Sequence, residues 1–206
     1  MRHRRAVTVF AVFVLTCAAP LAAQAPGVFP PPGSCPSGEV YFYPPITDAA
    51  GRPLLTPKQG IIKQIRAATR RIWVEVYEIT DTNMEIPNEL IARASGPNRV
   101  PDIQVLLNAY GTVKNENLDM APLFKKAGIT VYLDEAPTNP LTRKRVHTEG
   151  HNKIALFDAD GVLTGSMNWT NGSFDNAENL VFIRDRTLVS YYERNWQEHL
   201  QHSTRY

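Results

Sequence analysis

The chain has 206 residues, with 22 lysines and arginines against 20 aspartates and glutamates, which gives a formal charge of +2. This length fits one domain of the usual ~100–200 residues, and a hydrophobic content of 43% is enough to bury a core, which excludes wholesale disorder. Two cysteines cannot staple a chain of this length, so a disulfide-scaffolded miniprotein is excluded as well. The near-balance of charge argues against a histone-like basic protein.

Residues 1–23 have the pattern of a secretory signal peptide. A basic start, Met1 to Arg5, precedes an apolar run from Ala6 to Leu15, and small residues with cleavage points after Ala23 or Ala25 follow. The apolar run is short for the roughly 20 residues of a membrane span, so we expect export, to the periplasm or outside the cell, and no stable membrane span. Removal of residues 1–23 takes away three arginines and no acidic residue, which leaves a mature charge of −1.

A proline-rich stretch over residues 24–38 is typical of a stiff linker, and residues 39–206 are expected to form the single folded domain. Cys35, the cysteine that the mature chain keeps, lies in this stretch. In an oxidising compartment such a cysteine is either free or paired between chains.

The folded domain begins with alternating strand and helix patterns. Thr56 and Pro57 are a helix cap and a first helical residue. The alternation predicts an α/β fold with a mixed, largely parallel sheet flanked by helices. Before residue 134 we expect strands at 39–43, 72–79, 102–107 and 129–133, and helices at 57–68, 86–94 and 117–127.

From His151 the pattern changes to short strands at 152–157, 161–165 and 179–183, followed by a helix at 188–200. The helix carries apolar residues at regular spacing, and this stripe is expected to be core rather than a cofactor site. Its members are Leu188, Tyr192, Trp196 and Leu200.

The densest chemical segment lies in these short strands. Residues two apart on a strand project to the same face, so His151 shares a face with Lys153, and Ser166 and Asn168 have the same spacing after a glycine. An imidazole, an ammonium, a hydroxyl and an amide on one surface suit a phosphodiester: the donors neutralise the phosphate oxygens, and histidine attacks phosphorus or moves a proton. No cluster with metal-ligand spacing accompanies them, so we expect no metal and no cofactor.

These residues resemble a known pattern. The order His-x-Lys, four residues, Asp, six residues, Gly-Ser-x-Asn is the HKD signature of the phospholipase D superfamily, and one copy is present. The resemblance extends more loosely over residues 39–200 and implies that superfamily's α/β/α sandwich. Chains with a single copy resemble small bacterial endonucleases and mitochondrial cardiolipin hydrolases. The positions that match the signature are His151, Lys153, Asp158, Gly165, Ser166 and Asn168.

The resemblance also implies roles. His151 would be the nucleophile that forms a phosphohistidine, Lys153 and Asn168 would hold the phosphate oxygens, and Ser166 would help to hold the phosphate or its loop. Glu178 falls where the superfamily places a carboxylate that orients the histidine. Asp158 completes the catalytic motif, and we expect it to turn the strand rather than to touch substrate.

The mechanism requires two histidines, one that attacks and one that protonates the leaving oxygen. The other histidines of the chain lack a lysine two residues later, so a homodimer that brings the two copies of His151 together would complete the active site. The histidines without the lysine are His3, His147, His199 and His202.

Nucleic acid is the favoured substrate and phospholipid, possibly cardiolipin, is the alternative, because the motif recognises the phosphodiester and little of its substituents. Arg143, Lys144 and Arg145 form a basic run before His151 that is either a phosphate-contacting patch or a solvated loop. Trp73 and Tyr77 are expected to pack rather than to stack on substrate. A third hypothesis, a catalytically idle binding module, conflicts with the intact motif.

Overall fold

The computed structural model describes residues 37–80, 84–136, 138, 141–142, 144, 147 and 149–206. The expected signal peptide, most of the expected linker with Cys35, and two residues of the basic run, Arg143 and Arg145, lie outside the described residues. None of the helices in the described part of the chain combines the length and the apolar character that a bilayer span requires.

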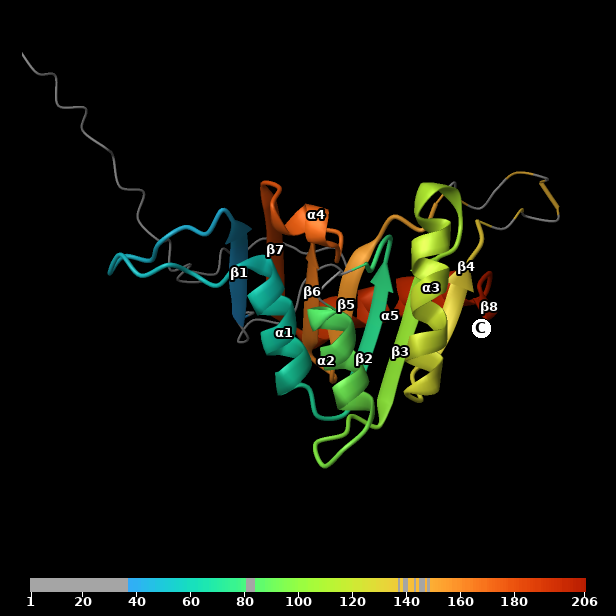
Figure 1. The fold of residues 1–206 in the computed structure, drawn as a ribbon, viewed down its shortest axis with the longest axis horizontal. Coiled ribbons are helices and arrows are strands. Elements are labelled where there is room, and N and C mark those ends of the chain that lie inside the picture. The colour runs from blue at the N-terminus through green and yellow to red at the C-terminus, as the bar shows by residue number, and fades with distance from the viewer. Residues whose placement is uncertain are drawn as a thin grey trace, which may run out of the picture.

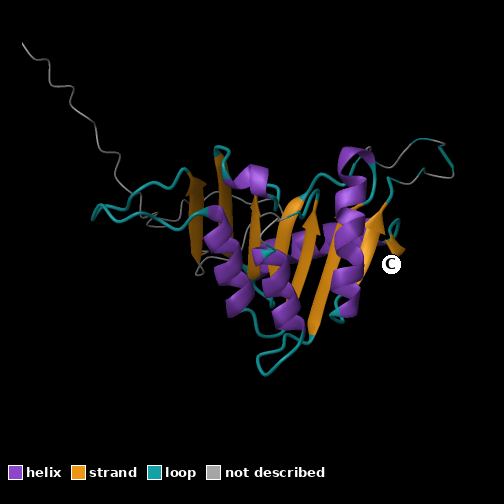
Figure 2. Ribbon diagram, viewed as in Figure 1, coloured by secondary structure: helices purple, strands orange, loops and turns teal. Residues whose placement is uncertain are grey.

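The described residues form one eight-stranded sheet in the order β1-β7-β6-β5-β2-β3-β4-β8, with helices on both faces (Figures 1 and 2). The strands are β1 (Ser37–Tyr43), β2 (Arg71–Val76), β3 (Asp102–Asn108), β4 (Thr130–Asp134), β5 (Lys153–Phe157), β6 (Gly161–Gly165), β7 (Glu178–Arg184) and β8 (Thr204–Arg205). The helices are α1 (Pro57–Ala67), α2 (Glu85–Ala94), α3 (Lys114–Lys126), α4 (Asn171–Phe174) and α5 (Arg186–Leu200), with a single 3-10 turn, η1 (Gly111–Val113).

The mixed α/β sheet is confirmed, but its parallel part is smaller than the sequence indicated. β3 runs parallel to β2 and β4, whereas every other pair of neighbours in the sheet is antiparallel. Parallel neighbours need a crossover connection, and here α2 and α3 supply the two that join adjacent strands. The expectation of a largely parallel sheet was wrong because β1, although α1 follows it, pairs antiparallel with β7 at the far edge.

Helix α1 shows how local sequence fixes an element that the core then uses. Thr56 and Gln59 form the reciprocal capping box, and Pro57 occupies the first turn, as expected. Ile61 and Ile65 on its inner face are fully buried. Gly60 permits close packing on the sheet, because a Cβ at this position would lie 2.7 Å from the ring of Tyr41.

The two faces of the sheet differ. Helices α1, α2 and α3 cover one face, and α5 crosses the other (Figure 1). The larger core lies under the three helices, while on the second face Trp196 of α5 stacks on Trp73 with ring centroids 4.6 Å apart. This contact confirms the packing role expected for Trp73 and for the apolar stripe of α5.

Candidate active site

One end of the sheet collects the motif residues. β5 runs antiparallel to β2 and β6, so its first residue lies beside the last residues of those two strands. Lys153 pairs with Val76 at the end of β2, and β6 ends with Gly165 next to the start of β7. The residues expected to act on phosphate therefore sit at this end: His151, Lys153, Ser166 and Asn168.

His151 and Lys153 contact one another, as their spacing predicts. Lys153 Nζ lies 2.9 Å from Nδ1 and 3.3 Å from Nε2 of His151, and donates a 2.7 Å hydrogen bond to the His151 carbonyl oxygen. His151 is exposed, whereas Lys153 is only 7% exposed. A reachable imidazole thus lies against a buried ammonium group.

This arrangement changes the protonation of both groups. Burial, and then the charge of Lys153, lower the pKa of His151 below its usual value, although Glu149 opposes the shift. Burial also lowers the pKa of Lys153 to about 8, against the opposing charges of Glu178, Glu149 and Glu78. At neutral pH the imidazole is therefore largely neutral and nucleophilic, while the ammonium still carries most of its charge.

Tyr77 belongs to the site, which the sequence analysis did not predict. Its ring centroid is 4.4 Å from that of His151, and Lys153 Nζ lies 4.9 Å from the Tyr77 centroid. Tyr77 comes one residue after β2, where its backbone N–H donates to the Asn152 carbonyl oxygen at 2.8 Å. Tyr77 was expected to continue a strand to residue 79, but β2 ends at Val76 and the Tyr77 ring lies against the ring of His151.

The roles of Ser166 and Glu178 differ in part from those expected. Ser166 Oγ donates to Glu178 Oε2 and accepts a 3.2 Å hydrogen bond from the Asn179 backbone N–H. Among the described contacts, Glu178 does not reach the ring of His151, whose neighbours are Lys153 and Tyr77. Glu178 acts on the site through its charge, which opposes the lowering of the Lys153 pKa.

Asn168 lies three residues after β6, between Met167 and Trp169, which are both fully buried. The Trp169 backbone N–H donates to the Glu78 carbonyl oxygen at 3.0 Å, which fastens this loop to the segment after β2. Asn168 Oδ1 is buried and has no hydrogen-bond partner among the described residues. Buried polar atoms normally have partners, so this amide oxygen is an exception that the described fold does not satisfy.

Asp158 lies at the opposite end of β5 from the candidate site. Its carboxylate accepts backbone hydrogen bonds from Thr69, Arg70 and Arg71 at 2.7–3.1 Å, and its backbone has φ of +53°. Burial alone would raise the pKa of Asp158, but these hydrogen bonds hold it below the usual carboxyl value. This placement agrees with the structural role expected for Asp158 and separates it from the phosphate-binding group.

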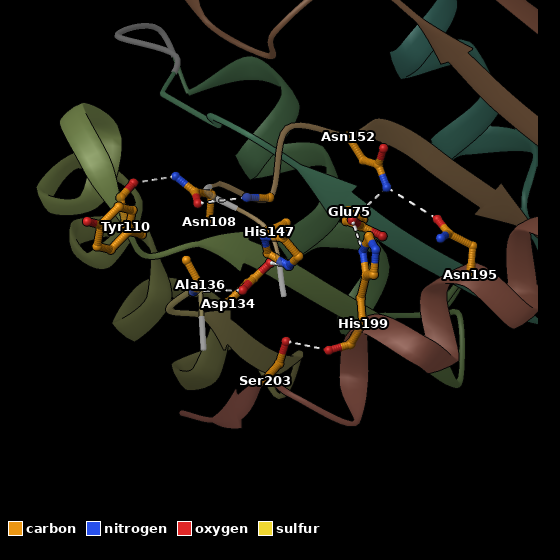
Figure 3. A network of polar contacts seen from close by, with 11 residues as sticks. Glu75, Asn108, Tyr110, Asp134, Ala136, His147, Asn152, Asn195, His199 and Ser203 are labelled. Carbon is orange, nitrogen blue, oxygen red and sulfur yellow. Dashed lines mark hydrogen bonds and ion pairs between the residues drawn. The ribbon is translucent and has the colours of Figure 1, made fainter. Parts of the chain in front are cut away.

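Asn152, between His151 and Lys153 in the motif, forms hydrogen bonds on the face of the sheet that α5 covers. Asn152 Nδ2 donates to Oε1 of the buried Glu75 at 2.8 Å and to Asn195 Oδ1 of α5 at 3.3 Å (Figure 3). His199 Nδ1 lies 2.5 Å from the same Glu75 oxygen. The hydrogen bond of His199 with Glu75 raises its pKa, against the effect of burial. Asn152 therefore fixes the backbone on which His151 and Lys153 stand.

An acidic pocket borders the site. Glu78, which is close enough to Lys153 to affect its pKa, contributes to the lining together with Glu116 and Asp119 of α3. Thr170 and Asn171, just after the motif asparagine, line the facing side. Of the basic run, Lys144 is exposed and its two arginines are not described. The described charge next to the site is thus mainly negative.

A second cluster with metal-ligand chemistry lies beyond the motif. Asp134, His147 and His202 place one possible ligand atom each within 4.8 Å of one another. No local ligand spacing predicts this cluster, because its residues are far apart along the chain. We expected no metal, and this cluster is a candidate metal site that the expectation did not take into account.

Comparisons with known proteins agree with this architecture. A family model described as "Cardiolipin synthase, PLD-like domain" matches residues 61–200. The chain is 29% identical over 146 residues to a phospholipase D of Rickettsia prowazekii (strain Madrid E), which covers 68% of this chain and 63% of that relative. It is 44% identical over 54 residues to the mitochondrial cardiolipin hydrolase of Xenopus tropicalis, which covers 24% of this chain and 26% of that protein.

Among solved structures, Nuc of Salmonella typhimurium, a phospholipase D family member, superposes with a TM-score of 0.65 at 21% identity. The match covers 83% of this chain and 98% of that one. At this identity the likeness concerns the fold. The chain spans less than two thirds of the length of the Rickettsia relative.

Proposed function

Because the chain belongs to the phospholipase D superfamily, we propose that it hydrolyses phosphodiester bonds through a covalent phosphohistidine formed on His151. The observation that carries the proposal is the contact between an exposed, neutral imidazole and a buried ammonium at the end of the sheet. A phosphodiester placed there meets a nucleophile and a positive charge together.

The chemistry proceeds in two displacements. A ring nitrogen of His151 forms a bond to phosphorus while the bond from phosphorus to the leaving oxygen breaks, and a second histidine gives that oxygen its proton. Water then attacks phosphorus, loses a proton to the second histidine and releases His151. Lys153 stabilises the charge on the phosphate oxygens in both steps, and neither step takes a metal ion or a cofactor.

The second histidine is the His151 of another copy of the chain. Among the described residues no other histidine lies against Lys153, and His199 is held by Glu75 on the other face of the sheet. A symmetric dimer would bring two copies of His151 to one phosphate. Light scattering during size-exclusion chromatography should show a dimer in active fractions, and a fully active monomer would contradict this arrangement.

Nucleic acid is the favoured substrate. His151 stands exposed at the sheet end, open to a long polymer, and the basic run from Arg143 to Arg145 ends six residues before it in the sequence. Binding that depends on phosphate contacts should weaken as salt rises. We therefore expect cleavage of plasmid DNA or RNA whose KM increases with ionic strength.

Phospholipid is the second candidate, and a specific observation favours it. Glu78, Glu116 and Asp119 in the adjacent pocket would repel the successive phosphates of a nucleic acid, whereas a phospholipid with a cationic head group would place its ammonium among them. The relative in Rickettsia prowazekii is named a phospholipase D, which supports the same candidate.

The deciding experiment compares the wild type with His151→Ala on plasmid DNA, RNA, and vesicles of phosphatidylethanolamine or cardiolipin, each with and without EDTA. The proposal expects turnover of at least one substrate, lost in His151→Ala and retained in EDTA at a temperature where the protein is folded. Turnover that persists in His151→Ala removes this residue as the nucleophile. No turnover of any of these substrates, or of a simple phosphate diester, contradicts the enzyme proposal.

We also propose that the protein acts after export, on the basis of the signal-peptide pattern in residues 1–23. Mass spectrometry of the protein recovered from the periplasm or medium should show a chain that begins at residue 24 or 26. Recovery from the cell interior of a chain that starts at Met1 would contradict export.

A further inference from the structure

Three side chains from distant parts of the sequence meet beside β4. Asp134 is the last residue of β4, His147 precedes the catalytic strand by six residues, and His202 follows α5. The ring centroids of His147 and His202 are 5.0 Å apart, and His147 Nε2 lies 3.1 Å from Asp134 Oδ2. The carboxylate of Asp134 is fully buried.

Several polar atoms of this cluster have no hydrogen bond in the described part of the chain. Asp134 Oδ1 accepts a 3.0 Å hydrogen bond from the Ala136 backbone N–H, but Oδ2 has no hydrogen bond in the described chain. Both ring nitrogens of His147 and Nδ1 of His202 are likewise buried without hydrogen bonds. Asp134 Oδ2 and His147 Nε2 have each other as ion-pair partners at 3.1 Å, so His147 Nδ1 and His202 Nδ1 are the two without a described partner. Such atoms are unusual, because buried polar groups are nearly always paired.

We propose that Asp134, His147 and His202 bind one divalent transition-metal ion, with Zn²⁺ as the preferred ligand. Two imidazole nitrogens and one carboxylate oxygen are donors that suit Zn²⁺, whereas Ca²⁺ and Mg²⁺ prefer sites made of oxygen alone. Ligands ~2.1 Å from a tetrahedral ion lie ~3.4 Å apart, so the 3.1 Å separation within the cluster needs almost no change. Rotation of the His202 ring brings in the third ligand, and water fills the fourth position.

His199 is a further neighbour of the cluster. The ring of His199 packs beside the cluster, with centroids 5.6 Å from His147 and 5.4 Å from His202. Its Nδ1 is held by the buried carboxylate of Glu75, as Figure 3 shows. Glu75 therefore fixes a ring that packs against the two proposed imidazole ligands without being a ligand itself.

A bound ion would link the segment that precedes His151 and β5 to the rest of the domain. A Cβ at Gly150, the residue before His151, would lie 2.7 Å from Asp134 Oδ2, so Asp134 packs directly against that backbone. The Gly150 N–H also donates to Asn108 Oδ1 at 3.1 Å. Bound metal would join β4, the segment before His151 and the C-terminal end of α5, which stabilises the position of His151 without taking part in its chemistry.

The experiment uses the full chain, stripped with a chelator and dialysed against Zn²⁺, Ca²⁺ or Mg²⁺. We expect one Zn²⁺ per chain by elemental analysis, and a Tm that rises by about 5–10 °C when free Zn²⁺ is 100 times its Kd. Ca²⁺ and Mg²⁺ should leave the Tm unchanged. Co²⁺ should give the visible absorption of a four-coordinate ion with nitrogen and oxygen ligands. Zinc at well below one equivalent, with no Tm shift, overturns the proposal.

Two variants assign the site. His202→Gln should lose the metal stoichiometry and the Zn²⁺-dependent rise in Tm, whereas His151→Ala, a histidine outside the cluster, should retain both. If His202→Gln does not fold, Asp134→Asn takes its place, and the Co²⁺ spectrum of the wild type still reports the ligands. Zinc binding that survives both cluster variants, or that His151→Ala abolishes, contradicts the assignment. Since His151→Ala is the inactive variant of the proposed function, failure of one proposal leaves the other standing.

Discussion

The two ends of β5 carry different residues of one sequence motif, and the fold treats their charges in opposite ways. At the first end, Lys153 is buried against His151, and its pKa falls to about 8 because burial disfavours its charge. At the other end, Asp158 is surrounded by backbone N–H donors, and its pKa lies below the usual value because they favour its charge. Burial thus disfavours the charge of Lys153 at the first end, whereas hydrogen bonds stabilise the charge of Asp158 at the other end.

The fold therefore treats the charges in the first eight residues of the motif, His151 to Asp158, in two different ways. Charges that the fold leaves under-compensated are available to stabilise a charged substrate, because no reorganisation is needed when it arrives. Charges that the fold satisfies hold the strand in place. The two ends should therefore respond in opposite ways to substitution: activity should depend on Lys153 and stability on Asp158.

The largest effect is expected from Lys153→Met. Loss of the ammonium should lower kcat/KM for the cleaved phosphodiester by roughly 10²–10³-fold, because the phosphate charge in the transition state loses its partner. The free energy of unfolding should stay the same or rise, because an apolar chain replaces a charge that burial disfavours. Steady-state kinetics and urea unfolding measure the two quantities. A large loss of stability would contradict this prediction and would mean that Lys153, like Asp158, stabilises the fold.

Asp158→Ala should show the reverse. Three backbone N–H groups lose their acceptor and an alanine is forced to positive φ, which should cost about 2 kcal/mol and lower the Tm by about 4–8 °C. Since the pKa of Asp158 is lowered in the folded protein, its contribution is present above the ordinary carboxyl pKa. It should be lost as pH falls through the folded value. Activity of the folded protein should change little.

Asp158→Asn is the matched control for this prediction. Asparagine tolerates positive φ and keeps one carbonyl acceptor, so its loss of Tm should be smaller than that of alanine. Calorimetry at pH 7 and at pH 3 should find the gap between wild type and Asp158→Ala reduced at the lower pH. A kcat that falls as far as in Lys153→Met would mean that Asp158 serves the chemistry after all.

The pH profile of cleavage should be bounded by the two groups at the first end of β5. The acid limb should lie below the usual histidine pKa, because protonation of His151 removes the nucleophile. Above the pKa of His151 the rate should begin to decline, because the second His151 must carry the proton for the leaving oxygen. A steeper alkaline limb should begin at about pH 8, where Lys153 loses its charge. Lys153→Arg should keep residual activity and lose this steeper limb, because arginine stays protonated. If the steeper limb were unchanged in Lys153→Arg, it would be caused by the titration of a group other than Lys153.

Local patterns predicted most of the fold. Thr56 and Pro57 predicted the start of α1, and the alternation of apolar and polar residues predicted the strands to within a few residues. The pairing of β1 with β7 was not predictable, because the sequence of β1 contains no signal that identifies its partner strand. The pairing depends on tertiary packing between residues that are at least 135 positions apart. The parallel content of the sheet was overestimated for the same reason.

The candidate site also has some features that local sequence predicts and others that only tertiary packing determines. The contact of His151 with Lys153 came from a spacing of two on a strand, which sequence displays directly. Tyr77 was missed because its position depends on where β2 ends. The metal cluster was missed because the fold joins residues of β4, of the segment before β5 and of the chain after α5. Side chains that meet through tertiary packing leave no local pattern.

The smallest expected effect comes from the acidic pocket beside the first end of β5. Replacing its two exposed carboxylates, in Glu116→Gln with Asp119→Asn, changes the charge by two without touching the motif. For a nucleic acid, the KM should fall about two- to tenfold at low salt, because each removed repulsion amounts to several tenths of a kcal/mol at the surface. For a phospholipid with a cationic head group the KM should rise by a similar factor, and kcat should be unchanged for both.

High salt separates this electrostatic effect from a change in structure, because screening should bring the double variant and the wild type to the same KM. The matched control is Glu193→Gln, a carboxylate of α5 that lies outside the pocket and pairs with Arg71. A KM that moves equally in the control, or that does not converge at high salt, would contradict a role for the pocket. A fall in KM for DNA, with a rise for vesicles of phosphatidylethanolamine, would show that the charge of this pocket sets which phosphodiester reaches His151.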